Sequence, residues 1–90
     1  MSEIPYEFTQ VSTNVIGSSS GRTIQLLGRA GLRVTLDGDV VDVNSEMLAS
    51  PMSIAIYSNS IPTEVSARVP DLLDEVVAGL KWAGFTVQLV

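Results

Sequence analysis

The chain has 90 residues, a net charge of −5, and neither cysteine nor histidine. These features exclude disulfides, thiolate zinc sites, cysteine nucleophiles and histidine general bases, and the negative charge opposes binding to nucleic acids. We expect one domain over residues 1–90, with residues 1–5 loose. We expect the protein in the cytoplasm, because the sequence shows neither a signal peptide nor a membrane span.

The first part of the chain predicts short strands separated by polar turns. Tyr6 and Phe8 alternate with polar residues, which predicts a strand that continues to Val11. Residues 18–21, SSSG, predict a flexible loop, because they lack the lysine and the glycine spacing of a phosphate-binding loop. Residues 23–27 then predict a second strand.

A β-hairpin is predicted over residues 32–36 and 40–44. Apolar and polar residues alternate in both arms, and the Asp-Gly pair at 37–38 is typical of a tight turn that needs positive φ. Residues 45–49 predict a short helical turn. Residues 52–57 predict a strand that is apolar on both faces, which favours a central position in the sheet.

The C-terminal part predicts one amphipathic helix from Pro70, followed at once by a strand. Leu72, Val76 and Leu80 form an apolar stripe, and the carboxylates of the early turns suit the positive end of the helix dipole; they belong to Asp71, Asp74 and Glu75. Residues 85–90 alternate as a strand. The predicted fold is therefore α+β: a single, mostly antiparallel sheet of about five strands, one helix packed on one face, and a final strand after it.

Carboxylates are densest around the predicted hairpin turn. Valines interrupt them, so the spacing of a calcium loop is missing, and we expect a solvated face or an acidic partner-binding patch rather than a metal or cofactor site. Glu46 is expected to cap the following turn or to pair with an arginine such as Arg33. Two roles stay open for Trp82: closing the core, or anchoring an interface.

Three segments follow one another between residues 32 and 61: the hairpin RVTLDGDVVDV, the step Ser45-Glu46-Met47-Leu48, and the run IAIYSNSI. In this order, and with a helix and a strand after them, they resemble a family of small bacterial immunity proteins of polymorphic toxin systems. The family has an aromatic residue soon after the Ser-Ile pair, whereas Pro62-Thr63-Glu64-Val65 follows here. The resemblance implies a non-enzymatic protein that binds and blocks a cognate toxin.

These observations lead to the hypothesis of a protein-binding domain whose acidic surface blocks a basic toxin. The candidate contact residues are Asp37, Asp39, Asp42, Glu46, Tyr57 and Asn59. A chaperone of a secreted substrate would share these features, whereas an enzyme is disfavoured because no carboxylate pair has catalytic spacing. The alternative is a homo-oligomeric structural protein or a phage virion or assembly component, because the uncharged strand FTVQLV would expose an edge that a second copy could cover as a homodimer.

Overall fold

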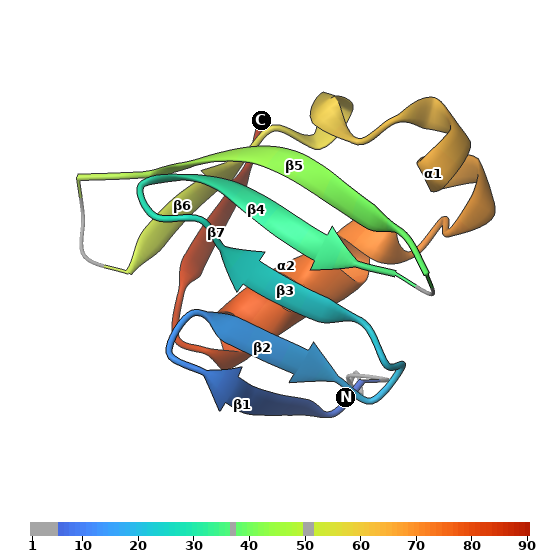
Figure 1. Ribbon diagram of the computed structural model, residues 1–90. Coiled ribbons are helices and arrows are strands. Elements are labelled where there is room, and N and C mark those ends of the chain that lie inside the picture. Colours follow the sequence, from blue (N-terminus) through green and yellow to red (C-terminus); the bar gives the residue numbers. More distant parts are fainter. Residues whose placement is uncertain (1–5, 37, 50–51) are drawn as a thin grey trace, which may run out of the picture.

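The computed structural model describes residues 6–36, 38–49 and 52–90 and shows one curled seven-stranded sheet with the longest helix against its inner side (Figure 1). The strands are β1 (Phe8–Ser12), β2 (Val15–Ser18), β3 (Thr23–Leu26), β4 (Ala30–Thr35), β5 (Val40–Met47), β6 (Ser53–Ile56) and β7 (Thr86–Leu89). The helices are the 3-10 segment η1 (Ser58–Ser60), α1 (Thr63–Arg68) and α2 (Leu72–Trp82).

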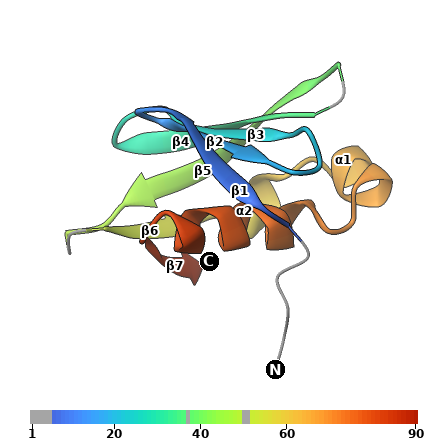
Figure 2. The ribbon, with the colours of Figure 1, turned by 90° about the horizontal axis from the view of Figure 1, so that it is seen from below.

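The strands lie in the sheet in the order in which they occur in the chain. Each neighbouring pair is antiparallel except β6 and β7, which are parallel because the helices connect them. Figure 2 shows β1 to β4 passing over one side of α2 while β6 and β7 curl down beside it. None of the helices in the described ranges has the length and apolar character that crossing a bilayer requires.

The α+β class and the mostly antiparallel sheet are confirmed, but the count of about five strands and one helix is wrong. Strand β2 was not predicted, because its adjacent Val15 and Ile16 do not alternate; it is held by pairing with β1 and β3 on its two sides. Helix α1 was not predicted either; it has six residues and buries one side chain, Val65. Short elements of this kind are stabilised by tertiary contacts more than by their own sequence.

The predicted helical turn at residues 45–49 is also wrong, because β5 continues to Met47 and its residues 45–47 pair with residues 54–56 of β6. On its other side β5 pairs with β4 through a β-bulge. Leu32 faces Val43 and Ala30 faces Glu46, so two residues of β5 lie opposite the single Gly31. The predicted β4–β5 hairpin is confirmed. The strand predicted to be central, β6, pairs on both sides but lies next to the edge strand β7.

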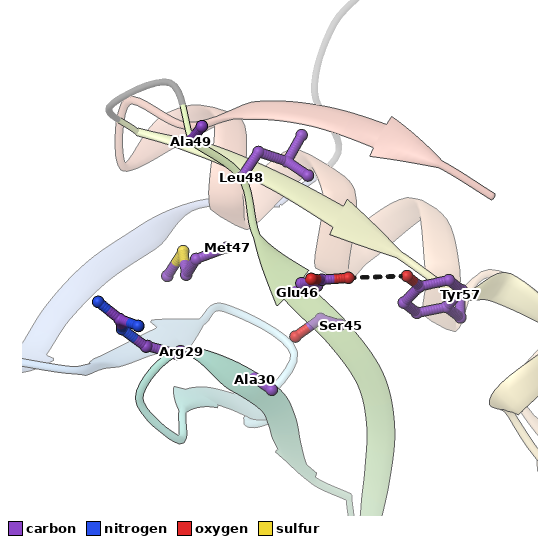
Figure 3. A pocket seen from close by; sticks show the side chains of 8 residues that line it. All are labelled: Arg29, Ala30, Ser45, Glu46, Met47, Leu48, Ala49 and Tyr57. Carbon is purple, nitrogen blue, oxygen red and sulfur yellow. Dashed lines mark hydrogen bonds between the residues drawn. The ribbon is translucent and has the colours of Figure 1, made fainter.

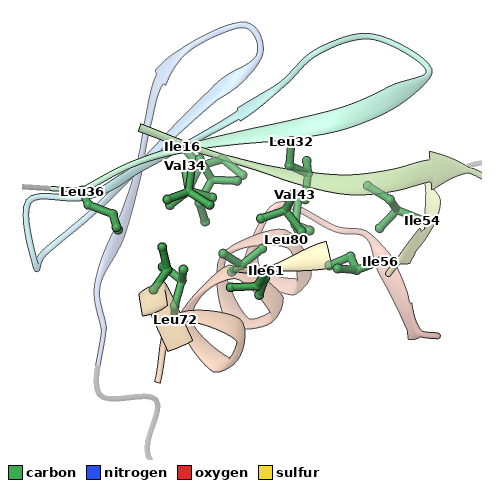
Figure 4. Packing of buried hydrophobic residues seen from close by; sticks show 14 residues of the cluster. Ile16, Leu32, Val34, Leu36, Val43, Ile54, Ile56, Ile61, Leu72 and Leu80 are labelled. Carbon is green, nitrogen blue, oxygen red and sulfur yellow. The ribbon is translucent and has the colours of Figure 1, made fainter. Parts of the chain in front are cut away.

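The core lies between the inner face of the sheet and α2 (Figure 4). The predicted stripe of Leu72, Val76 and Leu80 is fully buried there. A Cβ at Gly79 would lie 2.8 Å from Ile24 Cδ1, so this glycine lets the helix approach the sheet closely. Trp82 is 47% exposed and its ring centroid lies 6.1 Å from that of Phe8, which places it at the edge of the core.

Candidate functional site

The predicted contact residues do not form one cluster. Asp39 directly precedes β5 and Glu46 lies near the other end of that strand, about 23 Å away for a chain that rises about 3.3 Å per residue. Asn59 is exposed in η1, directly after Tyr57 and Ser58. Asp37 lies outside the described residues.

The carboxylates of Asp39 and Asp42 are held in ion pairs within the chain. Arg33 Nε lies 2.9 Å from Asp42 Oδ1, between β4 and β5, and Arg68 Nη2 of α1 lies 3.0 Å from Asp39 Oδ2. The hydrogen bond to Asp42 raises the pKa of Arg33 above its ordinary value. Both pairs are solvent-exposed, so each adds little to the stability of the fold, and either can be rearranged at little cost.

Glu46 has a different partner from the one expected. The hydroxyl of Tyr57 donates a hydrogen bond of 3.0 Å to Glu46 Oε2 (Figure 3). Across the described residues, no arginine or lysine lies within ion-pair distance of Glu46, and Arg33 pairs with Asp42 instead. The carboxylate of Glu46 therefore keeps acceptor capacity for a partner outside the chain.

Glu46 and Tyr57 lie together on the wall of a groove of about 630 Å³ on the sheet surface. Its lining residues are Arg29, Ala30, Ser45, Glu46, Met47, Leu48, Ala49 and Tyr57 (Figure 3). A shallower hollow of about 520 Å³ continues it over Gly31 and Asn44. The groove follows the β-bulge, where the small residues of β4 leave space between the larger side chains of Arg29 and Tyr57.

Main-chain contacts fix the two sides of this groove. The N–H of Gly31 donates to Ser45 Oγ at 3.1 Å across the bulge. Ser60 Oγ accepts from the N–H of Asn44 at 2.9 Å and donates to the carbonyl of Tyr57 at 2.6 Å, which ties η1 to β5. Tyr57 is thereby held in place before any partner arrives.

The chemistry of the groove is that of a polar binding surface. It presents a guanidinium from Arg29, a carboxylate from Glu46 and a phenol from Tyr57. In the described part of the chain there is no group of three or more acidic side chains that could hold a metal ion. Arg29 was not among the predicted contact residues. The glycines at 28 and 31 could have predicted an irregular backbone on both sides of Arg29, because glycine within a strand often marks a bulge.

A second polar cluster, also missed from the sequence, lies at the other end of the molecule. Glu75 of α2 is buried, and its carboxylate accepts hydrogen bonds from Ser18 Oγ at 2.5 Å, Ser20 Oγ at 2.5 Å and Arg22 Nη1 at 2.7 Å. The serine-rich segment expected to be a flexible loop is therefore anchored to the helix. The sequence could have predicted this burial, because Glu75 follows Leu72 by three residues and so lies on the apolar face of the helix.

Tyr57 provides a direct test of the groove geometry. Its hydrogen bond to Glu46 raises the pKa of Tyr57, because ionisation would lose the bond and place two negative charges together. Glu46→Gln is expected to return this pKa towards the ordinary value of 10.0, as measured by ultraviolet titration of tyrosinate. Tyr6, whose bond to Asp71 raises its pKa to about 12, is the internal control. An unchanged Tyr57 titration in this variant would contradict the contact.

Comparison of the chain with protein-family models, with curated proteins and with solved structures finds no match in any of the three. The resemblance of residues 32–61 to immunity proteins therefore stays a hypothesis.

Proposed function

We propose that the protein is a non-enzymatic binding domain of the immunity type, which blocks a basic toxin in the cytoplasm. The observation that carries the proposal is the groove, where Glu46 is oriented by Tyr57 and has no cationic partner among the described residues. A lysine or arginine of the toxin would bind this carboxylate, and the ring of Tyr57 would cover the bound cation.

The charge distribution supports a basic partner. The chain carries a net charge of −5, and such a field accelerates the encounter with a positively charged molecule. Asp42 and Glu46 project from the same face of β5, where they are exposed and alternate with the buried Val43 and Ser45. The salt bridge of Asp42 to Arg33 is weak enough to open when a partner's cation competes for the carboxylate.

The side-chain inventory supports a binding role over catalysis. The chain has no histidine and no cysteine, and Lys81 is its single lysine. Lys81 lies in the last turn of α2, outside the groove lining. Tyrosine and arginine, which are both present in the groove, are the residue types enriched at the energetic centres of protein interfaces.

The test is capture of the partner by tagged protein from the native cytosol, followed by measurement of the association rate for the partner identified. We expect one stoichiometric basic protein that is released by rising salt. Glu46→Lys should lower its affinity by at least about tenfold.

Asp74→Lys is the matched control, because it makes the same change in net charge at an exposed position of α2, on the opposite side of the sheet. Equal weakening by both variants would show that net charge alone attracts the partner and would remove the groove from the proposal. Failure to retain any basic protein would overturn the function itself.

A further inference from the structure

The two edges of the sheet differ in how they are protected. On β1 an extra residue at Val11 forms a bulge against β2, and the side-chain amide of Gln10 donates to the carbonyl of Ser12 at 2.5 Å. Bulges of this kind prevent an edge from pairing with another strand. By contrast, β7 pairs with β6 in unbroken register and carries neither proline nor charge. It is an unprotected edge.

The outward hydrogen-bonding groups of β7 belong to two residues. The N–H of Thr86 donates to Met52 O at 2.7 Å and that of Val90 to Ile56 O at 2.8 Å, so the even-numbered residues face β6. Because this direction alternates along a strand, the N–H and C=O groups of Val87 and Leu89 point away from the sheet. The carbonyl of Val90 also accepts from Ser58 N and Ser58 Oγ, which holds the end of the strand in place.

We propose that β7 pairs antiparallel with β7 of a second copy of this chain, across a two-fold axis at Gln88. In this register Val87 faces Leu89 of the second copy, and the reverse pair is equivalent by symmetry. Each of these pairs exchanges two main-chain hydrogen bonds, since all four groups involved point outward. Gln88 then faces Gln88 of the second copy in a pair without main-chain bonds, where the two side-chain amides can bond to each other.

A second copy fits this edge because the strand is self-complementary in that register. Leu89 is 55% exposed and lies on the same face as Val87, so pairing places apolar side chains opposite each other on that face. No charge lies on β7, so two molecules of net charge −5 meet at a place where like charges do not face each other. The pairing goes beyond toxin binding, and none of the groove residues belongs to β7.

The register can be tested by cysteine cross-linking, because the chain has no cysteine of its own. Facing residues in a pair without main-chain bonds have Cα atoms about 4.5 Å apart, which is within the range of a disulfide. Gln88→Cys is therefore expected to give mostly disulfide-linked dimer on mild oxidation. Thr86→Cys is the matched control, since its two copies would lie about 13 Å apart along the pair and should cross-link little.

The association itself is measured by sedimentation equilibrium over a range of concentrations. Wild-type protein should show twice the chain mass, and Leu89→Pro should raise the dimer dissociation constant at least tenfold, because it removes an outward donor and leaves the bonds to β6 intact. Leu89→Thr, which keeps that N–H, controls for loss of the side chain. A strict monomer, equal cross-linking at positions 86 and 88, or a strand of a different protein bound at this edge would overturn the proposal.

Discussion

Replacing Glu75 with alanine is expected to lower the free energy of unfolding by about 3–5 kcal/mol. Glu75 is 1% exposed and its carboxylate accepts three hydrogen bonds, so the substitution leaves the hydroxyls of Ser18 and Ser20 without this acceptor. It also removes the charge that faces the guanidinium of Arg22. Hydrogen bonds to an ionised group are stronger than those between neutral groups, so losing all three of them together is costly. Chemical denaturation at neutral pH measures the difference.

The matched control is Asp74→Ala, one position earlier on the exposed side of the same helix turn. It removes a carboxylate that makes no such contacts, and its effect should be within about 0.5 kcal/mol. Comparable losses in the two variants would show that the charge near the helix start matters, and that the contacts to the serine loop do not.

The same cluster makes stability depend on pH. Burial raises the pKa of Glu75, but the hydrogen bonds from Ser18, Ser20 and Arg22 outweigh burial and leave this pKa below its ordinary value. A carboxyl whose pKa is lower in the folded state stabilises the fold above its unfolded pKa of about 4.3. This contribution is lost as the pH falls from there through the folded pKa. In Glu75→Gln the acid-dependent loss should be smaller than in wild type, whereas identical pH profiles would contradict the assignment.

Replacing Val76 with aspartate is expected to abolish folding at room temperature. Val76 is 1% exposed at the centre of the apolar stripe of α2. The change forfeits about 1.5–3 kcal/mol of apolar burial and adds the cost of placing a carboxyl in the core without a partner. The sum reaches the total stability of about 5–15 kcal/mol that domains of this size possess. Circular dichroism and thermal unfolding measure the outcome.

Val11→Asp is the control for this substitution, because the same chemical change is made at a valine that is 60% exposed on β1. It should leave cooperative unfolding intact. Native thermal unfolding of Val76→Asp would mean that α2 presents a different face to the sheet.

Prediction from the sequence succeeded where one periodic pattern sufficed. The recurrence of Leu72, Val76 and Leu80 determined both the helix and its buried face, and alternation with an Asp-Gly pair determined the β4–β5 hairpin. In each case the signal is local, since neighbouring residues in the chain share one face of one element. The candidate site was found only in part: Glu46 and Tyr57 do meet, eleven positions apart in the chain.

The sequence by itself determined the α+β class, the mostly antiparallel pairing and the apolar face of the long helix. Only the tertiary structure decided that β2 pairs with two neighbours, that β5 continues through a bulge opposite Gly31, and that Glu75 is buried under the serine loop. Each of these depends on groups far apart in the chain. A buried carboxylate needs hydrogen-bond donors, and a four-residue strand needs neighbouring strands. Both kinds of partner come from distant parts of the chain, so no local sequence pattern predicts them.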